Sequence, residues 1–379
     1  MIKDNKNKIF SMSGITFITK IHDGNFAVIT MNGVLKIILG KKPFNCLKTK
    51  QVTKGIELYN LKEIYIKNKG LDIKNNNNIN DLNKKIYLIL YEKQILIFSF
   101  DNKYQKCFLI QKIINNNYIG ALTQLRNKNI IFWDKKNRIN LISYINQNKE
   151  IFQNIINQPK IIGKDVSNHF ILSFMEYDEN KIITTSTDKH PLGENVIRIY
   201  KLETINDKGS KLINIKNFNG YSCSIFENNI SKLENQNTIC IAINYYIKHN
   251  IIINKSAILL INFEFLEITT ILEINFSVNS IFNFSLNSNI GSYKRIYEYL
   301  IVSHFKGESN SKIKKKGSDN LRFLDFYVFE PKYQYEPILI PEKRIITNST
   351  IDITNSFLLN KNNLVIFQTD QISIYSLSI

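Results

Sequence analysis

Glycine, proline and cysteine are scarce in this chain of 379 residues, with 14, 6 and 4 copies respectively. The four cysteines, Cys46, Cys107, Cys223 and Cys240, lie far apart and form no Cys-x-x-Cys pair. This spacing argues against a zinc site and against a disulfide framework, and it favours free, buried thiols in a reducing compartment. With so little glycine, turns must be built mainly from Asn, Asp and Lys, and Asn tolerates left-handed backbone conformations.

A long hydrophobic run is also lacking. No stretch of about eighteen consecutive apolar residues occurs, so no transmembrane helix is expected. The first residues, MIKDNKNKIFSMSG, contain neither the apolar core of a signal peptide nor the Arg-rich character of a transit peptide. We therefore expect a cytoplasmic protein.

Motifs for catalysis and nucleotide binding are absent as well. Gly163-Lys164 lacks both the preceding glycine and the following Ser or Thr of a phosphate-binding loop. Neither H-E-x-x-H, G-x-S-x-G nor an EF-hand loop occurs. The histidines lack the spacing of metal ligands; they are His22, His169, His190, His249 and His304. The sequence therefore predicts no catalytic residues, no metal and no cofactor.

Positive charge is abundant, with a formal net charge of +18 at pH 7. Such a charge raises the question of nucleic-acid or acidic-membrane binding. Only six of the 50 basic residues are Arg, however, and Arg is the side chain suited to bidentate contacts with phosphate and guanine. Lysines spread over solvated faces are the simpler interpretation, and we do not expect nucleic acid to be the principal partner.

The strongest signal is a repeated unit of four short apolar runs separated by polar turns. The first copy comprises 14–21, 25–31, 34–39 and 44–49. Between its second and third runs, Asn32-Gly33 is the dipeptide that a two-residue type I′ hairpin favours. This copy predicts a meander of four antiparallel strands.

The same pattern recurs along the rest of the chain. Five further copies are expected at 56–64, 85–92, 95–100, 105–113; at 118–125, 129–134, 139–145, 150–156; at 169–177, 181–187, 195–203, 211–218; at 221–227, 238–246, 257–265, 271–276; and at 280–286, 297–305, 321–329, 338–345. The last copy has only three runs of its own: 350–355, 363–369 and 371–379. A leftover run at 8–13 supplies the missing strand, because a three-stranded sheet would expose an apolar edge.

We therefore predict an all-β fold: a single closed β-propeller of about seven four-stranded blades spanning residues 1–379. The N-terminal strand 8–13 completes the last blade, formed by 346–379. Because each repeat adds its own share of core, a chain of this length need not divide into several domains.

Two copies resemble the WD-repeat family. In that family a small-residue stretch and an Asp end the second strand, and the third strand carries an aromatic residue. Ser186-Thr-Asp188 followed by VIRIYKLE (196–203) resembles this pattern, with Tyr200 as the aromatic. Gln368-Thr-Asp370 followed by ISIYSLS (372–378) does so again, with Tyr375. The resemblance implies a propeller that acts by binding other proteins.

Trp133 is the single tryptophan and precedes Asp134 at the end of a second strand. A lone tryptophan can anchor a partner, since tryptophan is enriched among hot spots. An aromatic residue on an apolar strand more commonly packs in the core, and we expect Trp133 to pack between blades.

Three long insertions fall between second and third strands of consecutive copies, at 188–195, 247–255 and 306–320. Corresponding loops of a propeller share one face, and insertions in repeat proteins collect on the binding face. Two of these loops are basic, and one has an apolar centre. The expected partner-binding residues are Lys312, Lys314, Lys315, Lys316, Lys248, Ile251, Ile252 and Ile253; Lys255 adds a further charge.

The sequence thus predicts a non-catalytic scaffold that binds other proteins, acidic ones in particular, as a subunit of a larger complex. One alternative is an enzyme or ligand-binding propeller that uses its central channel. Another is lipid or RNA contact through the basic loops. Phosphoinositide-binding propellers use a paired-arginine motif, whereas Leu321-Arg322-Phe323-Leu324 contains one arginine, which disfavours a membrane partner.

Overall fold

A computed structural model gives the fold of this chain. It describes residues 5–11, 14–21, 24–40, 46–52, 60–64, 86–100, 106–115, 117–134, 136, 138–142, 160–164, 169–188, 196–205, 209–219, 230–233, 237–244, 256–274, 277–290, 293–305, 322–330, 338–347, 353–360, 363–368 and 371–376. Regular secondary structure within these residues is entirely β-strand, which confirms the all-β prediction.

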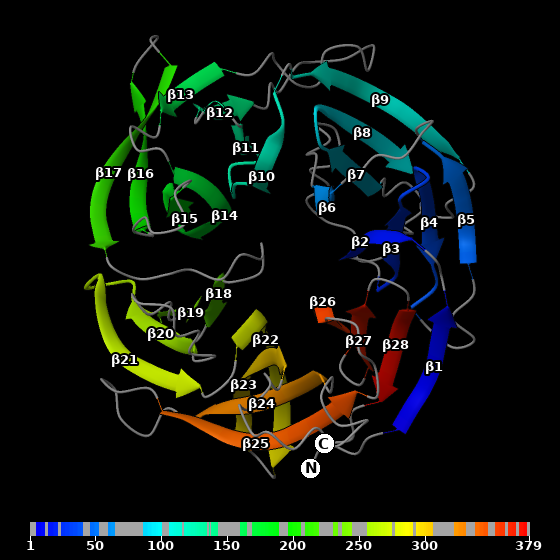
Figure 1. Cartoon of the computed structure of the whole chain (residues 1–379), viewed down its shortest axis with the longest axis vertical. Coiled ribbons are helices and arrows are strands. Elements are labelled where there is room, and N and C mark those ends of the chain that lie inside the picture. The colour runs from blue at the N-terminus through cyan, green and yellow to red at the C-terminus, as the bar shows by residue number, and fades with distance from the viewer. Residues whose placement is uncertain are drawn as a thin grey trace, which may run out of the picture. The chain divides into compact units, whose positions relative to one another are not determined.

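The described strands form seven four-stranded sheets with antiparallel pairing. Six sheets are meanders in which strands adjacent in sequence lie side by side. In the remaining sheet the order is β1-β28-β27-β26, so the strand Asn5–Ser11 pairs with the strand Gln371–Ser376. Figure 1 shows β1, drawn in blue, alongside β28, drawn in red. The N-terminal strand thus supplies the fourth strand that the last copy lacks.

The chain divides into two compact units, and unit 2 comprises Ser13–Val166 with Thr204–Lys211. It holds three sheets. Their strands are β2 (Ile15–Lys20), β3 (Phe26–Thr30), β4 (Val34–Ile38) and β5 (Cys46–Gln51); β6 (Asn60–Ile64), β7 (Ile86–Tyr91), β8 (Gln94–Phe100) and β9 (Cys107–Ile114); and β10 (Ile119–Gln124), β11 (Ile130–Asp134), β12 (Arg138–Ile142) and β13 (Lys160–Lys164).

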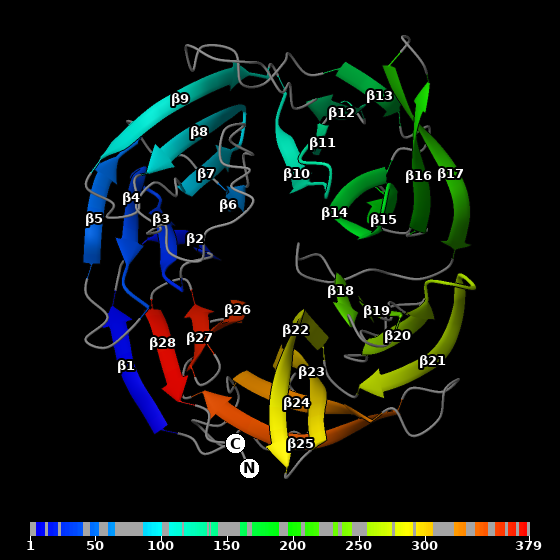
Figure 2. The ribbon, with the colours of Figure 1, turned by 180° about the vertical axis from the view of Figure 1, so that it is seen from behind.

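Unit 1 comprises Met1–Met12, Ser167–Glu203 and Leu212–Ile379. Its strands are β14 (His169–Asp178), β15 (Lys181–Asp188), β16 (Val196–Ile205) and β17 (Gly209–Asn219); β18 (Ile230–Leu233), β19 (Thr238–Asn244), β20 (Ser256–Asn262) and β21 (Glu267–Ile274); β22 (Ser277–Ile290), β23 (Tyr293–Phe305), β24 (Arg322–Glu330) and β25 (Ile338–Thr347); and β26 (Ile353–Asn360), β27 (Asn363–Gln368) and β28 (Gln371–Ser376) with β1 (Asn5–Ser11). Figure 2 shows the same strands from behind.

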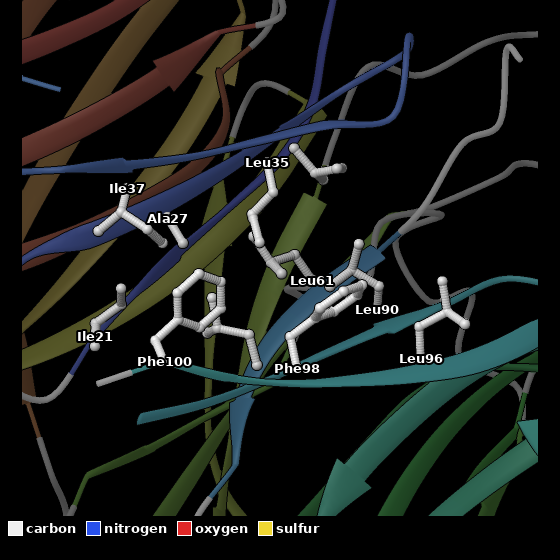
Figure 3. Packing of buried hydrophobic residues seen from close by; sticks show 11 residues of the cluster. Ile21, Ala27, Leu35, Ile37, Leu61, Leu90, Leu96, Phe98 and Phe100 are labelled. Atoms are coloured by element: carbon white, nitrogen blue, oxygen red, sulfur yellow. The ribbon is translucent and has the colours of Figure 1, made fainter. Parts of the chain in front are cut away.

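Inner strands of unit 2 are buried on both faces. In β7, Leu88 and Leu90 belong to a hydrophobic cluster shared with the β2–β5 sheet, whereas Ile89 and Tyr91 belong to one shared with the β10–β13 sheet. Figure 3 shows the first of these clusters from close by. Successive side chains of a strand point to opposite faces, so the β6–β9 sheet packs against a neighbouring sheet on either side. This two-sided burial explains why the strands read as continuous apolar runs.

Unit 1 follows the same rule. In β19, Ile239, Ile241 and Ile243 pack into a cluster with the β14–β17 sheet. The alternate residues Cys240 and Ala242 pack into a cluster with the β22–β25 sheet. Three consecutive sheets of unit 1 are therefore stacked in sequence order.

β-Bulges recur at equivalent places in the repeats, which the sequence pattern did not reveal. Five first strands are irregular near their start, at Ile15/Phe17, Ile119/Ala121, Ile171/Ser173, Val278/Ser280 and Ile353/Asn355. Five pairings of a third with a fourth strand are also irregular, at Ile37/Ile38, Ile97/Phe98, Ile139/Asn140, Leu260/Ile261 and Phe326/Tyr327. A bulge increases the local twist of a strand and leaves one residue out of the hydrogen-bonded ladder.

Left-handed turn residues are supplied partly by asparagine, as expected from the shortage of glycine. Asn180 has φ 57° and Asn237 has φ 47°, and each lies in a turn between two strands. Gly33, with φ 69°, closes the Asn32-Gly33 hairpin, and its N–H donates to the Thr30 carbonyl at 2.9 Å.

Trp133 is buried, with 3% of its surface exposed, and its position between blades stays a prediction. Its indole ring lies against Gly120, the bulged residue of β10, and a Cβ at position 120 would overlap the ring atoms Cζ3 and Cε3. Glycine is thus required at 120 for the ring to approach the backbone, and Trp133 is not an accessible anchor for a partner.

Two strand predictions were wrong in position. The fourth strand of the third sheet is Lys160–Lys164, and the predicted 150–156 lies outside the described residues. The first strand of the fifth sheet is Ile230–Leu233, and the predicted 221–227 likewise lies outside them. In both cases a longer apolar run drew the prediction away from a shorter strand, whose Ile162 or Leu233 is the residue that enters the core. The described residues contain no helix long and apolar enough to cross a membrane.

Candidate partner-binding site

The connections between second and third strands divide into short and long ones. Three residues join β3 to β4, two join β7 to β8, three join β11 to β12, and two join β27 to β28. By contrast, 7 residues join β15 to β16, 11 join β19 to β20, and 16 join β23 to β24. The three long connections, 189–195, 245–255 and 306–321, belong to the three stacked sheets of unit 1. We call the end of this stack from which they leave the long-connection end.

Two of the long connections leave from the same end of neighbouring sheets. Ser256 is the first residue of β20, directly after connection 245–255, and its side chain is fully buried. The N–H of Val278 donates to Ser256 Oγ at 3.0 Å. Val278 pairs with His304, one residue before the end of β23, where connection 306–321 begins. This hydrogen bond therefore joins the start of β20, where connection 245–255 ends, to the start of β22, which lies beside the end of β23 at which connection 306–321 begins.

A contact at the opposite end orients the remaining sheet. Tyr177 lies at the turn between β14 and β15, and Phe263 follows β20, both remote from the long connections. Their rings lie 5.7 Å apart, centroid to centroid. The contact joins the ends of the β14–β17 and β18–β21 sheets that carry no long connection. The opposite ends of the two sheets therefore lie on the same side, and connections 189–195 and 245–255 leave from there.

Buried hydroxyl groups fix the base of connection 189–195. Ser186 Oγ donates to the Val196 carbonyl at 2.9 Å, which ties the end of β15 to the start of β16. One residue earlier, Thr185 Oγ1 lies 2.8 Å from Ser173 Oγ on the neighbouring strand. Ser186 and Thr185 are both fully buried. These bonds hold the strands rigidly, so the long-connection end has a fixed foundation.

The predicted partner-binding residues all lie on these connections, outside the described part of the chain. They are Lys248, Ile251, Ile252 and Ile253 between β19 and β20, and Lys312, Lys314, Lys315 and Lys316 between β23 and β24. The structure therefore gives the strands that carry these residues. What sequence reasoning missed is how the strand ends are joined, because a hydrogen bond between residues 256 and 278 leaves no periodic signal.

Asp134 forms an ion pair and several hydrogen bonds at the turn that follows β11. Its carboxylate is fully buried and forms an ion pair with Arg138, with Nη2 and Oδ2 2.7 Å apart. Oδ1 accepts from the N–H of Lys136 at 2.9 Å, and Oδ2 accepts from the Asn140 side chain at 3.2 Å. Asp134 thus ends β11 and organises a tight turn, which is a structural role.

The WD-like residues that the structure describes occupy the expected places, and Asp370 lies outside the described residues. Asp188 is the last residue of the second strand β15. Tyr200 lies on the third strand β16 and Tyr375 on the third strand β28, and 7% and 6% of their surfaces are exposed. Both aromatic side chains are therefore core residues, as in the pattern that the sequence resembles.

Chemistry-bearing side chains are dispersed. Among the described residues, no group of three or more His, Cys, Asp or Glu is placed to hold a metal ion. Cys46, Cys107 and Cys240 are free thiols, and Cys240 is buried as predicted, whereas Cys107 is half-buried and Cys46 is exposed because it lies on an outer strand; Cys223 lies outside the described residues. Burial raises the pKa of the Cys107 thiol, although Lys50 and Lys48 act in the opposite direction.

Tyr177 should report on packing at the end opposite the long connections. Burial, with a smaller contribution from Asp178, raises its pKa to about 12. Its ordinary value is about 10, so the neutral phenol stabilises the fold below pH ~10 and this contribution is lost as the pH rises to about 12. We expect the stability of the native protein to fall more steeply between these pH values than that of Tyr177→Phe. Urea unfolding at both pH values measures this, and parallel curves would contradict the assignment.

Comparison with known proteins supports the architecture. No family model and no curated protein matches the sequence. In structure, the chain is similar to the WD40 β-propeller domain of Doa1, with 11% identity and a TM-score of 0.54 over 99% of this chain and 97% of that one. It is also similar to the β-propeller domain of Myceliophteria thermophila Cps50 (Swd1), with 8% identity and a TM-score of 0.52 over 99% and 100%.

Similarity to Chaetomium thermophilum Raptor extends over 100% of this chain but 29% of Raptor, with 11% identity and a TM-score of 0.57. The chain thus spans less than a third of that protein. At these identities the likeness establishes the fold, which is that of a divergent WD-repeat-like propeller.

Proposed function

We propose that residues 1–379 form one closed propeller that binds other proteins, without catalysis, through the long-connection end. The observation that carries the proposal is the contrast in connection length. The three long connections are confined to three stacked sheets, and packing contacts place their attachment points on one side. A WD40-like fold supports an interaction scaffold in general, because its rigid sheets position loops for binding.

Charge and apolar character specify the partner. Connection 306–321 carries Lys312, Lys314, Lys315 and Lys316, and connection 245–255 carries Lys248 beside Ile251-Ile252-Ile253. Lysines around an apolar centre suit an acidic protein surface with exposed hydrophobic residues, since charges steer the encounter and apolar burial provides affinity. The protein would then act as a subunit of a complex.

Charge reversal tests this function. Lys312→Glu, Lys314→Glu, Lys315→Glu and Lys316→Glu are combined in one variant. Its matched control reverses four exposed lysines elsewhere, Lys93, Lys136, Lys211 and Lys216. Both variants change the net charge equally, so only a local contact distinguishes them. Tagged proteins are used to recover partners from the native cell, with quantification by mass spectrometry.

We expect the variant with the four reversed lysines at 312–316 to recover at least about tenfold less partner than the native protein, because four favourable charge contacts become repulsive. The control variant should recover the partner normally, and raising the salt concentration should weaken recovery by the native protein. Equal recovery by both variants would show that these lysines are only a solvated loop, and would place binding elsewhere on the molecule.

A further inference from the structure

A second surface lies in unit 2, on the outer strands β5 and β9 of neighbouring sheets. Lys48 and Lys50 of β5 pair directly with Ile37 and Leu35 of β4. Both β4 residues belong to the hydrophobic cluster between the β2–β5 and β6–β9 sheets (Figure 3). Directly paired residues share a face of the sheet, so the two lysines are on the side that faces the β6–β9 sheet.

Strand β9 presents the matching face. Leu109 and Lys112 pair with Phe98 and Leu96 of β8, which belong to the same cluster. Ile114, two residues beyond Lys112, returns to this face because side chains alternate along a strand. These five residues, Lys48, Lys50, Leu109, Lys112 and Ile114, form what we call the basic–apolar strip.

The two halves of the strip are adjacent. The Cys107 side chain at the start of β9 packs against the same cluster and is half-buried. Lys50 and Lys48 lie close enough to act electrostatically on its thiol. The lysines of β5 and the exposed face of β9 therefore border one continuous surface.

Exposed apolar groups and charge of one sign characterise the strip. Leu109 is 51% exposed and Ile114 is 71% exposed, although both are aliphatic residues of a strand. Neither β5 (CLKTKQ) nor β9 (CFLIQKII) contains an acidic residue. Exposing two aliphatic side chains to water is unfavourable, and no contact within the part of the chain that the structure describes compensates for it. Exposed apolar groups with lysines around them are typical of a surface that a partner covers.

Strand β9 is also an edge. It is the last strand of its sheet, so one side of its backbone is not paired within that sheet. A bulge at Ile110 interrupts the ladder, which leaves regular segments on both sides of it. An edge strand can accept an extended segment by backbone pairing, with side-chain contacts giving specificity.

We propose that the basic–apolar strip binds an extended acidic segment of a partner protein, in which two aliphatic residues flank an acidic one. Leu109 and Ile114 are separated by four strand steps and one bulged residue, about 13 Å, which an extended chain spans in four residues. An acidic residue midway faces Lys112, and flanking ones face Lys48 and Lys50.

Other occupants fit less well. A second copy of this chain paired through β9 would place lysine against lysine, which opposes association. A single-stranded nucleic acid would need aromatic stacking platforms or arginine on this face, and the five residues of the strip include neither. The acidic protein segment is therefore the occupant that the chemistry favours.

A synthetic peptide, Glu-Thr-Ile-Thr-Glu-Thr-Ile-Thr-Glu with a fluorescent label, places its Ile and Glu side chains on one face and tests this proposal by anisotropy. Two control peptides replace its Glu residues by Lys or its Ile residues by Ser. The full chain is compared with Lys48→Glu/Lys50→Glu/Lys112→Glu and with a control variant, Lys136→Glu/Lys211→Glu/Lys216→Glu, whose lysines are exposed and lie outside the strip. Hydrogen exchange of β9 amides reports strand pairing, which loose electrostatic attraction would not change.

We expect saturable binding to the native chain, protection of β9 amides, and at least about tenfold weaker binding by the strip variant but not by the control variant. The Lys-containing peptide should bind the strip variant, which shows that the variant is folded. Binding unchanged by charge reversal, absence of saturable binding, or formation of dimers by the free native chain would overturn the proposal. The Lys312–Lys316 variant should bind the peptide normally, so this surface and the long-connection end can fail separately.

Discussion

Replacing Asp134 by alanine should lower the free energy of unfolding by about 3 kcal/mol, because it removes the fully buried carboxylate that pairs with the partly exposed Arg138. The loss is large because Asp134 Oδ2 accepts from both Arg138 and Asn140, and Oδ1 accepts from a backbone N–H. Each of these donors would lose its acceptor. Chemical unfolding followed by circular dichroism measures the change.

A second ion pair of the chain provides the control. Asp178 Oδ2 and Lys181 Nζ lie 2.9 Å apart, and the two side chains are 42% and 41% exposed. Removing this pair with Asp178→Ala should cost less than about 1 kcal/mol, since solvent screens the charges. The loss in the free energy of unfolding for Asp134→Asn should lie between these two values. The amide oxygen of Asn can still accept a hydrogen bond, but its NH2 group places a donor against Arg138. Equal losses for Asp134→Ala and Asp178→Ala would contradict the assigned role of the turn.

Deleting residues 1–13 should lower the melting temperature by about 5–10 °C and cause aggregation. The deletion removes β1, which pairs with β28 from Asn5 to Ser11. It exposes the backbone edge of a strand whose Ile372, Ile374 and Tyr375 are buried. Unpaired apolar edges are templates for association with other chains.

Complementation distinguishes loss of a strand from a general effect of truncation. A synthetic peptide of residues 1–13, added in excess, should restore the melting temperature by occupying the vacant edge. A scrambled peptide of the same composition should not. An unchanged melting temperature of the truncated protein would show that the N-terminal strand does not stabilise the fold.

Much of the fold could be predicted from the sequence, because two-sided burial leaves a strong signal. β3, Phe26–Thr30, is buried at every position, and the Asn32-Gly33 turn after it marks the hairpin. The place of the N-terminal strand follows from the repeat. Six complete copies of four strands and three C-terminal strands leave one position open, and the run at 8–13 fills it. Short strands were missed where a single apolar residue enters the core, as Leu233 does in Ile230–Leu233.

The candidate surfaces were less predictable, for a physical reason. Leu109 and Ile114 lie in an apolar run that resembles the core strands, and only the stacking of sheets shows that the outer strand of a blade remains exposed. The strand ends at Ser256 and Val278 meet through one hydrogen bond between different sheets. Contacts of this kind depend on tertiary packing, which residue spacing does not encode.

Hydrogen exchange on the complex of this protein with its recovered partner tests the central claim most directly. If partners bind at the long-connection end, amides in 189–195, 245–255 and 306–321 should become protected on binding. The short connection 92–93 and the turn 263–266 should exchange at the rate of the free protein. Protection confined to those short turns, with no change in the three long connections, would contradict the account.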